Sequence, residues 1–226
     1  MNQANKKKSR LLASSLILNS ILIIILIIAI IKYWTPISEK LFSRSDKKKK
    51  IALLGNSLTA AGDWESLLSR KDVLNAGTGH GGFTTSHYVT LVQSDVIVHH
   101  PKICFIEGGI NDISVGIPLS RTKNNLQSLI DTLRNYKIIP VLTLTFHTSF
   151  DTLKNKMVDS LNSIIKNLAE KNKLDYIDIN NKISENGFLK KEYSTDGTHL
   201  TKEAYPIWAK EILDLLTRLK FDTSAK

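Results

Sequence analysis

Cysteine is almost absent from this sequence. Cys104 is the only cysteine among 226 residues. A single cysteine cannot form a disulfide within the chain, and by itself it indicates no redox compartment. Because Cys104 lies in the apolar run KICFIEGG, we expect a small buried hydrophobic residue there rather than a reactive thiol.

An excess of positive charge is missing from most of the chain. The formal net charge is +10, from 31 Lys and Arg against 21 Asp and Glu. Residues 1–50 hold 11 of the basic and 2 of the acidic side chains, which leaves 20 against 19 for residues 51–226. A domain that binds nucleic acid presents a basic face. We therefore expect no nucleic-acid partner, and assign the basicity to the N-terminal end.

Charged residues are also absent from one long segment, Leu11–Ile31. As a helix its 21 residues would extend roughly 31 Å, which matches the hydrocarbon core of a bilayer. A cleavable signal peptide has a shorter apolar region, about 7–15 residues, followed by a small-residue cleavage site. Here Tyr33 and Trp34 follow, and they are typical of interfacial anchors. The pattern predicts a retained signal anchor over residues 11–32, after a basic tail of residues 1–10.

Basic residues flank this segment on both sides, so two orientations compete. The larger basic cluster follows the segment, and simple counting of positive charges would place it in the cytoplasm. A short basic N-terminus directly before a first span is instead typical of an anchor whose N-terminus stays inside. We expect this second arrangement, a single-pass membrane protein with its domain outside the cytoplasm. Residues 33–50 are polar and charged, and predict a tether.

From Ile51 onward, short apolar runs alternate with segments of helical periodicity. The runs IALLGNS, DVLNAG, KICFIEGG, IIPVLTLTF and LDYIDIN predict five buried strands. Helices are expected over Leu119–Tyr136 and Leu153–Lys171, through Trp64–Leu68, and from near Thr201. This alternation indicates a parallel sheet with right-handed crossovers, and therefore a three-layer α/β domain. Ligands of such sheets bind at the carboxyl ends of the strands.

A serine follows the first predicted strand, in the sequence GNSLT. Ser57 precedes a predicted helix, and the unpaired N–H groups at a helix start would favour a developing anion. The alternative is that Ser57 only caps the helix, a position for which serine is a preferred residue. This motif alone leaves the nucleophile and the cap both open.

A histidine and an aspartate lie between the last predicted strand and the last helix, in STDGTHLTKEAY. A hydroxyl nucleophile needs a general base, and histidine suits this role because it titrates near neutrality. The turn-forming D-G-T-H would let Asp196 reach one ring nitrogen of His199 and leave the other free. The alternative is a loop aspartate beside a surface or capping histidine.

Two further motifs could stabilise an anion. Asn111 follows the third strand in EGGIND, and its side-chain amide can donate hydrogen bonds. Glycines follow the second strand in NAGTGHGGFTT, where a backbone without Cβ can approach a substrate and aim an N–H group. Either motif alone is compatible with an ordinary turn. The joint arrangement decides, because all four motifs lie at the same end of one predicted parallel sheet.

These motifs resemble those of the SGNH (GDSL-like) hydrolase family, whose blocks are named for Ser, Gly, Asn and His. GNSLT matches the first block, GGFTT the second, GGIND the third and DGTH the fifth. The resemblance covers residues 51–219 and implies a flavodoxin-like fold with five parallel strands. The domain predicted over residues 51–226 is therefore expected to be an SGNH hydrolase domain.

The resemblance implies a role for each matching residue. Ser57 would be the nucleophile, His199 the base and Asp196 the orienting acid. The oxyanion hole would consist of the Ser57 N–H, the Gly82 N–H and the Asn111 amide. Two departures stand out. The residue before Ser57 is asparagine where the family usually has aspartate, and the second block is long and glycine-rich. Gly82 is chosen there by its spacing to Thr84, with Gly81 as the second choice.

Other hydrolytic chemistries lack their motifs. Ser57 is not surrounded by a G-x-S-x-G nucleophile elbow. His99 and His100 have neither an H-E-x-x-H motif nor a carboxylate at ligand spacing, which favours a solvated pair. His80 and His147 could border the pocket, but as lone loop histidines we expect them to be incidental. No metal and no organic cofactor is therefore expected.

Little chain remains for a lid over the site. Predicted elements and short loops fill most of the stretch from Asn111 to Asp196, and no apolar insert is visible. We therefore expect a shallow acyl pocket and a short ester, acetyl above all, of a small molecule or an envelope glycan. The alternatives are lysophospholipid or thioester cleavage, acyl transfer to an alcohol, and a non-catalytic ligand-binding module.

Overall fold

The computed structural model describes residues 16, 19–20, 22–29 and 49–221. Its contacts divide the chain into two units, Met1–Lys47 and Lys48–Lys226. In the first unit residues 22–29 are helical. No helix among the described residues is long and apolar enough to cross a bilayer. The predicted tail, the ends of the anchor and nearly all of the tether lie outside the described residues, so the signal anchor stays a prediction.

A five-stranded parallel sheet forms the centre of the second unit. Its strands are β1 (Ile51–Leu54), β2 (Val73–Asn75), β3 (Ile103–Ile106), β4 (Ile139–Thr143) and β5 (Tyr176–Ile177). The spatial order is β2-β1-β3-β4-β5, with every pairing parallel. This is the flavodoxin-like order, in which the chain crosses from one side of β1 to the other after β2. The predicted parallel sheet and the places of its five strands are confirmed.

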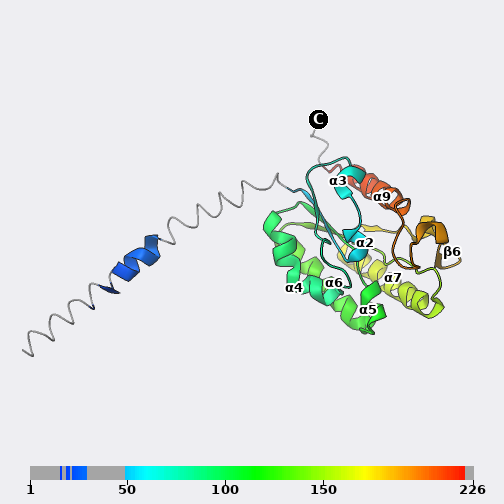
Figure 1. The fold of residues 1–226 in the computed structure, drawn as a ribbon, viewed down its shortest axis with the longest axis horizontal. Coiled ribbons are helices and arrows are strands. Elements are labelled where there is room, and N and C mark those ends of the chain that lie inside the picture. The colour runs from blue at the N-terminus through cyan, green and yellow to red at the C-terminus, as the bar shows by residue number, and fades with distance from the viewer. Residues whose placement is uncertain (1–15, 17–18, 21, 30–48, 222–226) are drawn as a thin grey trace, which may run out of the picture. The chain divides into compact units, whose positions relative to one another are not determined.

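Helices cover both faces of this sheet (Figure 1). One face carries α4 (Thr85–Asp95), α6 (Leu119–Asn135) and α7 (Thr152–Asn172). The other carries α3 (Trp64–Leu67), α8 (Asn180–Ile183) and α9 (Ala204–Arg218). The predicted bounds of α6 and α7 are correct to within one residue, and the last helix begins three residues after Thr201. The three-layer α/β prediction is confirmed.

The strands read as continuous apolar runs because both faces of the sheet are buried. In β1, Ile51 and Leu53 pack in the core cluster on the α9 side, whereas Ala52 and Leu54 pack in the cluster on the α6 side. Successive side chains of a strand point to opposite faces, so a two-sided core needs apolar residues at every position. Cys104 in β3 is fully buried, and burial raises its thiol pKa to about 12. The expected burial of this cysteine is confirmed.

Several short elements carry no signal in the sequence. They include α2 (Ser57–Ala60), α5 (Ile110–Ser114), and the hairpin of β6 (Ser184–Glu185) with β7 (Phe188–Leu189). Helices of four or five residues are shorter than two turns and show no apolar period. The helix predicted after Ser57 is α3, which begins seven residues later, and Ser57 itself begins α2.

Candidate active site

Ser57 is the first residue of α2, directly beyond the carboxyl end of β1. The cap of this helix is Asn56, whose side-chain Oδ1 accepts from the Leu58 N–H at 2.9 Å. The alternative role of Ser57 as the cap is therefore wrong. Since Asn56 takes up the capping contact, the half-buried Ser57 hydroxyl is available for another partner.

That partner is His199, whose Nε2 lies 3.0 Å from Ser57 Oγ. The other ring nitrogen, Nδ1, lies 2.7 Å from Asp196 Oδ2. A carboxylate accepts, so Nδ1 carries the proton and Nε2 is the acceptor that faces the serine. The structure thus brings these three predicted residues into one hydrogen-bonded chain, the geometry required for an activated hydroxyl.

Asp196 is held in its ionised form. Its Oδ1 accepts from the backbone N–H groups of His199 at 2.8 Å and Thr198 at 2.9 Å. These bonds and the one to the His199 ring lower the pKa of Asp196 to about 2. At neutral pH the carboxylate therefore stays charged and fixes the orientation of the imidazole.

The loop that carries Asp196 and His199 is tied to the loop between β4 and α7. Ser149 donates its backbone N–H to the Gly197 carbonyl at 2.8 Å. Gly197 has a φ of 92°, and a Cβ there would lie 2.6 Å from a ring carbon of Phe150. Only glycine meets both demands. Phe150 itself is 68% exposed, so an aromatic ring borders this loop at the surface.

The two remaining predicted residues are Asn111 and Gly82, and Asn111 contacts the residue after Gly82. Asn111 is the second residue of α5, and its Nδ2 donates to the Phe83 carbonyl at 2.9 Å. Gly82, directly before Phe83, has a φ of 76°, whereas Gly81 has no positive φ. The space around both glycines is open. The structure therefore places the Asn111 amide against the glycine segment, and Nδ2 keeps its second hydrogen for another acceptor.

His80 braces the glycine segment rather than bordering a pocket. It is 7% exposed, with Nδ1 at 3.2 Å from the Gly55 carbonyl and Nε2 at 2.9 Å from Asp95. Its ring stacks on Phe83 with centroids 4.7 Å apart. The residue therefore joins the glycine segment to the turn before Ser57 and to the end of α4.

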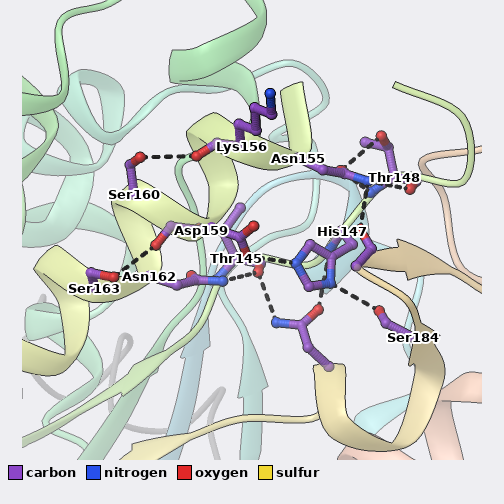
Figure 2. Close-up of polar contacts among 12 residues, drawn as sticks. Thr145, His147, Thr148, Asn155, Lys156, Asp159, Ser160, Asn162, Ser163 and Ser184 are labelled. Carbon is purple, nitrogen blue, oxygen red and sulfur yellow. Dashed lines mark hydrogen bonds and ion pairs between the residues drawn. The ribbon is translucent and has the colours of Figure 1, made fainter. Parts of the chain in front are cut away.

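His147 is likewise engaged at both nitrogens (Figure 2). Nδ1 lies 3.1 Å from Ser184 Oγ and Nε2 lies 2.9 Å from Asp159 in α7. The backbone N–H of His147 donates to Asn180 Oδ1. These contacts hold the loop after β4 against α7, α8 and the start of β6. His147 therefore has a structural role and is not part of the Ser57 group, the hydrogen-bonded chain of Ser57, His199 and Asp196.

Glu107 was missed by the sequence reasoning. It follows β3 and is 1% exposed, with its carboxylate against Asn56 and Thr59 in the turn around Ser57. Burial raises its pKa to about 7. The available signal was a charged residue at the end of the apolar run KICFIEGG, where a carboxylate is costly unless it is hydrogen-bonded.

The Ser57 group is open to solvent. The side chains of His199 and Asp196 are 48% and 55% exposed. Two surface cavities, of about 330 Å³ beside Trp64 and about 210 Å³ beside Asp178, are not lined by these residues. Within residues 49–221 and the described part of the first unit, no cluster of three His, Cys, Asp or Glu side chains could hold a metal ion.

The sequence of this chain is similar to those of known proteins. The sequence model of the GDSL-like Lipase/Acylhydrolase family matches residues 53–207. An N-acylneuraminate cytidylyltransferase of Streptococcus agalactiae is 27% identical over 168 residues, which are 73% of this chain and 37% of that protein. The chain thus spans little more than a third of that relative.

Solved structures share the fold. A GDSL-like lipase of Bacteroides thetaiotaomicron is 24% identical, with a TM-score of 0.67 over 76% of this chain and 90% of that one. An acetylxylan esterase of Geobacillus stearothermophilus is 17% identical, with a TM-score of 0.60 over 74% of this chain and 93% of that one. Since the family match covers more than half of the sequence, the chain belongs to the GDSL-like lipase/acylhydrolase family.

Proposed function

We propose that this protein hydrolyses short-chain O-acyl esters, acetyl esters above all, through an acyl-enzyme on Ser57. The observation that carries the proposal is the hydrogen-bonded chain of Ser57 to His199 at 3.0 Å and His199 to Asp196 at 2.7 Å. A serine next to a correctly oriented neutral imidazole can lose its proton as it attacks a carbonyl.

In the proposed reaction, Ser57 Oγ attacks the ester carbonyl while His199 Nε2 takes the hydroxyl proton. The imidazolium then returns this proton to the leaving alcohol, and an acyl ester remains on Ser57. Water, deprotonated by His199, attacks that ester and releases the carboxylic acid. Asp196, which stays ionised because its pKa is about 2, stabilises the transient imidazolium.

The negative charge that develops on the carbonyl oxygen needs donors. We assign this role to the Ser57 N–H at the start of α2, the Gly82 N–H and the side-chain amide of Asn111. The contact of Asn111 Nδ2 with the Phe83 carbonyl supports the assignment, because it holds the amide beside the glycine segment and leaves one amide hydrogen.

A short acyl group is favoured by the openness of the site. Neither of the two cavities described above is lined by Ser57, Asn111 or His199, and both His199 and Asp196 are about half exposed. A long acyl chain would gain little burial there, and apolar burial is what favours longer chains, at about 0.8 kcal/mol per CH₂. Lysophospholipid or thioester cleavage is the second candidate.

A carbohydrate is our proposed source of the ester. The fold is compatible with such a substrate, since a structure named as an acetylxylan esterase shares it. Acyl transfer to a second alcohol instead of water remains an alternative outcome of the same acyl-enzyme.

We further propose that residues 11–32 anchor the enzyme in a membrane, with residues 51–226 outside the cytoplasm. The tether of residues 33–50 has 18 residues and spans at most roughly 60 Å at ~3.4 Å per residue, which keeps the site near the envelope surface. Protease treatment of intact cells should digest the domain. Protection until lysis would reverse the orientation.

The substrate proposal is tested on aryl esters with acyl chains of two to twelve carbons, using the full-length protein in detergent. We expect kcat/KM to be highest at about two to four carbons and to fall beyond, because a shallow site buries no further methylene groups. The Ser57→Ala variant is the control for background hydrolysis. A maximum at eight carbons or longer would contradict the short-chain proposal and favour the lipid substrate.

A further inference from the structure

The buried side chain of Glu107 contacts the turn that carries Ser57. Its carboxylate accepts from Asn56 Nδ2 at 3.2 Å, from the Asn56 backbone N–H at 3.5 Å and from Thr59 Oγ1 at 3.1 Å. A Cβ on Gly55 would lie 2.9 Å from Glu107 Oε2. The close approach of the turn to this carboxylate therefore depends on glycine at that position.

The partners of Glu107 lie on both sides of Ser57 in the chain. The Asn56 side chain is held at Nδ2 by Glu107, while its Oδ1 accepts from the Leu58 N–H and caps α2. Rotation of this amide would break the cap and move the first turn of α2. Because Ser57 is the first residue of α2, the position of its hydroxyl depends on the amide that Glu107 fixes.

Glu107 is also continuous with the segment that carries Asn111. Gly108 and Gly109 follow it, and the Gly108 carbonyl accepts from Thr145 Oγ1 at 2.7 Å. Gly109, with a φ of 107°, is the cap of α5, in which Asn111 is the second residue. One buried side chain thus lies between the nucleophile turn and the start of the Asn111 segment.

A buried carboxylate at position 107 is expected to lower the stability of the fold. Glu107 is fully buried, and its three donors are amide and hydroxyl groups without positive charge. An apolar residue would continue the β3 run at lower cost, since a buried charge is costly without a counter-ion. Stability therefore does not account for Glu107.

Ionisable groups that face Glu107 come from neighbouring elements. The charge of Asp112 in α5 helps to raise the pKa of Glu107, after the larger effect of burial. Burial and the Glu107 charge raise the pKa of Tyr205 in α9 to about 12, and they raise that of Tyr88 in α4 well above its ordinary value. Both phenols are therefore neutral at the pH where Glu107 titrates, so they add no negative charge beside its carboxyl group.

We propose that Glu107 is a positioning residue for the proposed nucleophile: its carboxylate fixes Asn56 and Thr59, and through them the first turn of α2 with Ser57. This inference rests on the proposed function of Ser57. Asn56 suits this role because its Nδ2 donates to Glu107, which an ionised aspartate at that position could not do. Position 56 thus supplies an amide donor and position 107 a carboxyl acceptor.

The test exchanges the two groups. Asn56→Asp places two carboxylates together, Glu107→Gln places two amides together, and the double variant restores one of each in reverse. We expect kcat to fall on the order of 10²-fold in Asn56→Asp and about tenfold in Glu107→Gln, with KM nearly unchanged, because the hydroxyl is displaced while the substrate surface is kept. The double variant should recover to within about threefold of wild type. Glu170→Gln, on the exposed end of α7, is the matched control.

The readouts separate positioning from general support of the fold. The rate of fluorophosphonate labelling of Ser57 should follow kcat through the four proteins, whereas the thermal midpoint should not. If the fall in kcat of the double variant equals the product of the two single-variant falls to within a factor of about two, the proposal is overturned. Should Asn56→Asp fail to fold, Glu107→Leu replaces it, and wild-type kcat in Glu107→Leu would also overturn the proposal. A wild-type chain without esterase activity or labelling contradicts the proposed function instead.

Discussion

Ser57 Oγ and His199 Nε2 lie 3.0 Å apart although 142 positions separate the two residues in the chain. The distance arises because β1 ends directly before α2, while the loop before α9 returns to the same edge of the sheet. In a parallel sheet all strands deliver their following loops to this edge, so residues distant in sequence meet there.

The first prediction concerns this pair. Ser57→Ala and His199→Ala should each lower kcat by about 10⁵-fold to 10⁶-fold on an aryl acetate, and the double variant should be no slower than either. The effects do not add because the base has no role without its nucleophile. Steady-state kinetics of the three variants measures this, with circular dichroism to verify folding. Turnover at the wild-type rate in Ser57→Ala would end the assignment.

The second prediction concerns Asp196. Asp196→Asn should lower kcat on the order of 10⁴-fold, less than removal of Ser57 or His199, because an amide no longer selects the imidazole tautomer that faces the serine. The low pKa of Asp196, about 2, places its titration far below the working range. Asp196 should therefore cause no inflection in the pH profile of kcat/KM above about pH 4. A variant with wild-type kcat would contradict the orienting role.

The third prediction concerns the oxyanion donors. Asn111→Ala should lower kcat on the order of 10²-fold to 10³-fold with little change in KM, since the donor acts on charge that exists only in the transition state. Gly82→Ala should also lower kcat. Gly82 has a φ of 76°, and a side chain there strains the backbone that aims its N–H. If the main effect of Asn111→Ala were on KM, the amide would bind substrate rather than the transition state.

The fourth prediction separates two histidines by opposite outcomes. His147→Ala should lower the free energy of unfolding by about 1 kcal/mol, because the hydrogen bonds of the largely buried His147 ring to Ser184 and to the exposed Asp159 are lost, and should leave kcat within about threefold of wild type. His199→Ala should abolish turnover with little loss of stability, since its side chain is 48% exposed. Thermal melts and kinetics on the two variants together measure this. A catalytic defect in His147→Ala would give this residue a role in the site.

The fifth prediction concerns pH and Glu107. Burial raises its pKa in the folded state to about 7, above the ordinary value of 4.5. The folded state therefore holds this proton more tightly than the unfolded state, so the associated stability is complete below about pH 4.5 and is lost as the pH rises through about 7. Relative to wild type, Glu107→Gln should gain stability steadily between pH 5 and pH 8. Urea unfolding at four pH values measures the difference, and a flat difference would contradict the raised pKa.

Much of the fold and of the site was accessible from the sequence. The five strands are buried on both faces and so appear as apolar runs, and α6 and α7 are long enough to show their period. Ser57 and Asn111 are recognisable because they follow β1 and β3 closely, and His199 because its motif lies just before α9. The family resemblance inferred from these motifs is confirmed by the match over residues 53–207.

The remainder depended on contacts between distant residues. Asn56 rather than Ser57 caps α2, and a choice between two adjacent capping residues is decided by the turn geometry, not by their preferences. The place of Glu107 became visible only when the register of β1 and β3 set it below Asn56. The β6–β7 hairpin has two residues in each strand, which is too short for an alternating pattern.

The proposed acyl-enzyme on Ser57 is the centre of this account, and trapping it is the most direct test. The His199→Ala variant and the wild type are mixed with an aryl acetate, quenched in acid within one turnover, digested and mapped by mass spectrometry. We predict a single acetyl group on the peptide that contains Ser57 in wild type, and none in His199→Ala or Ser57→Ala. Steady turnover without an acetylated Ser57, or the same acetyl group on another residue, would contradict the account.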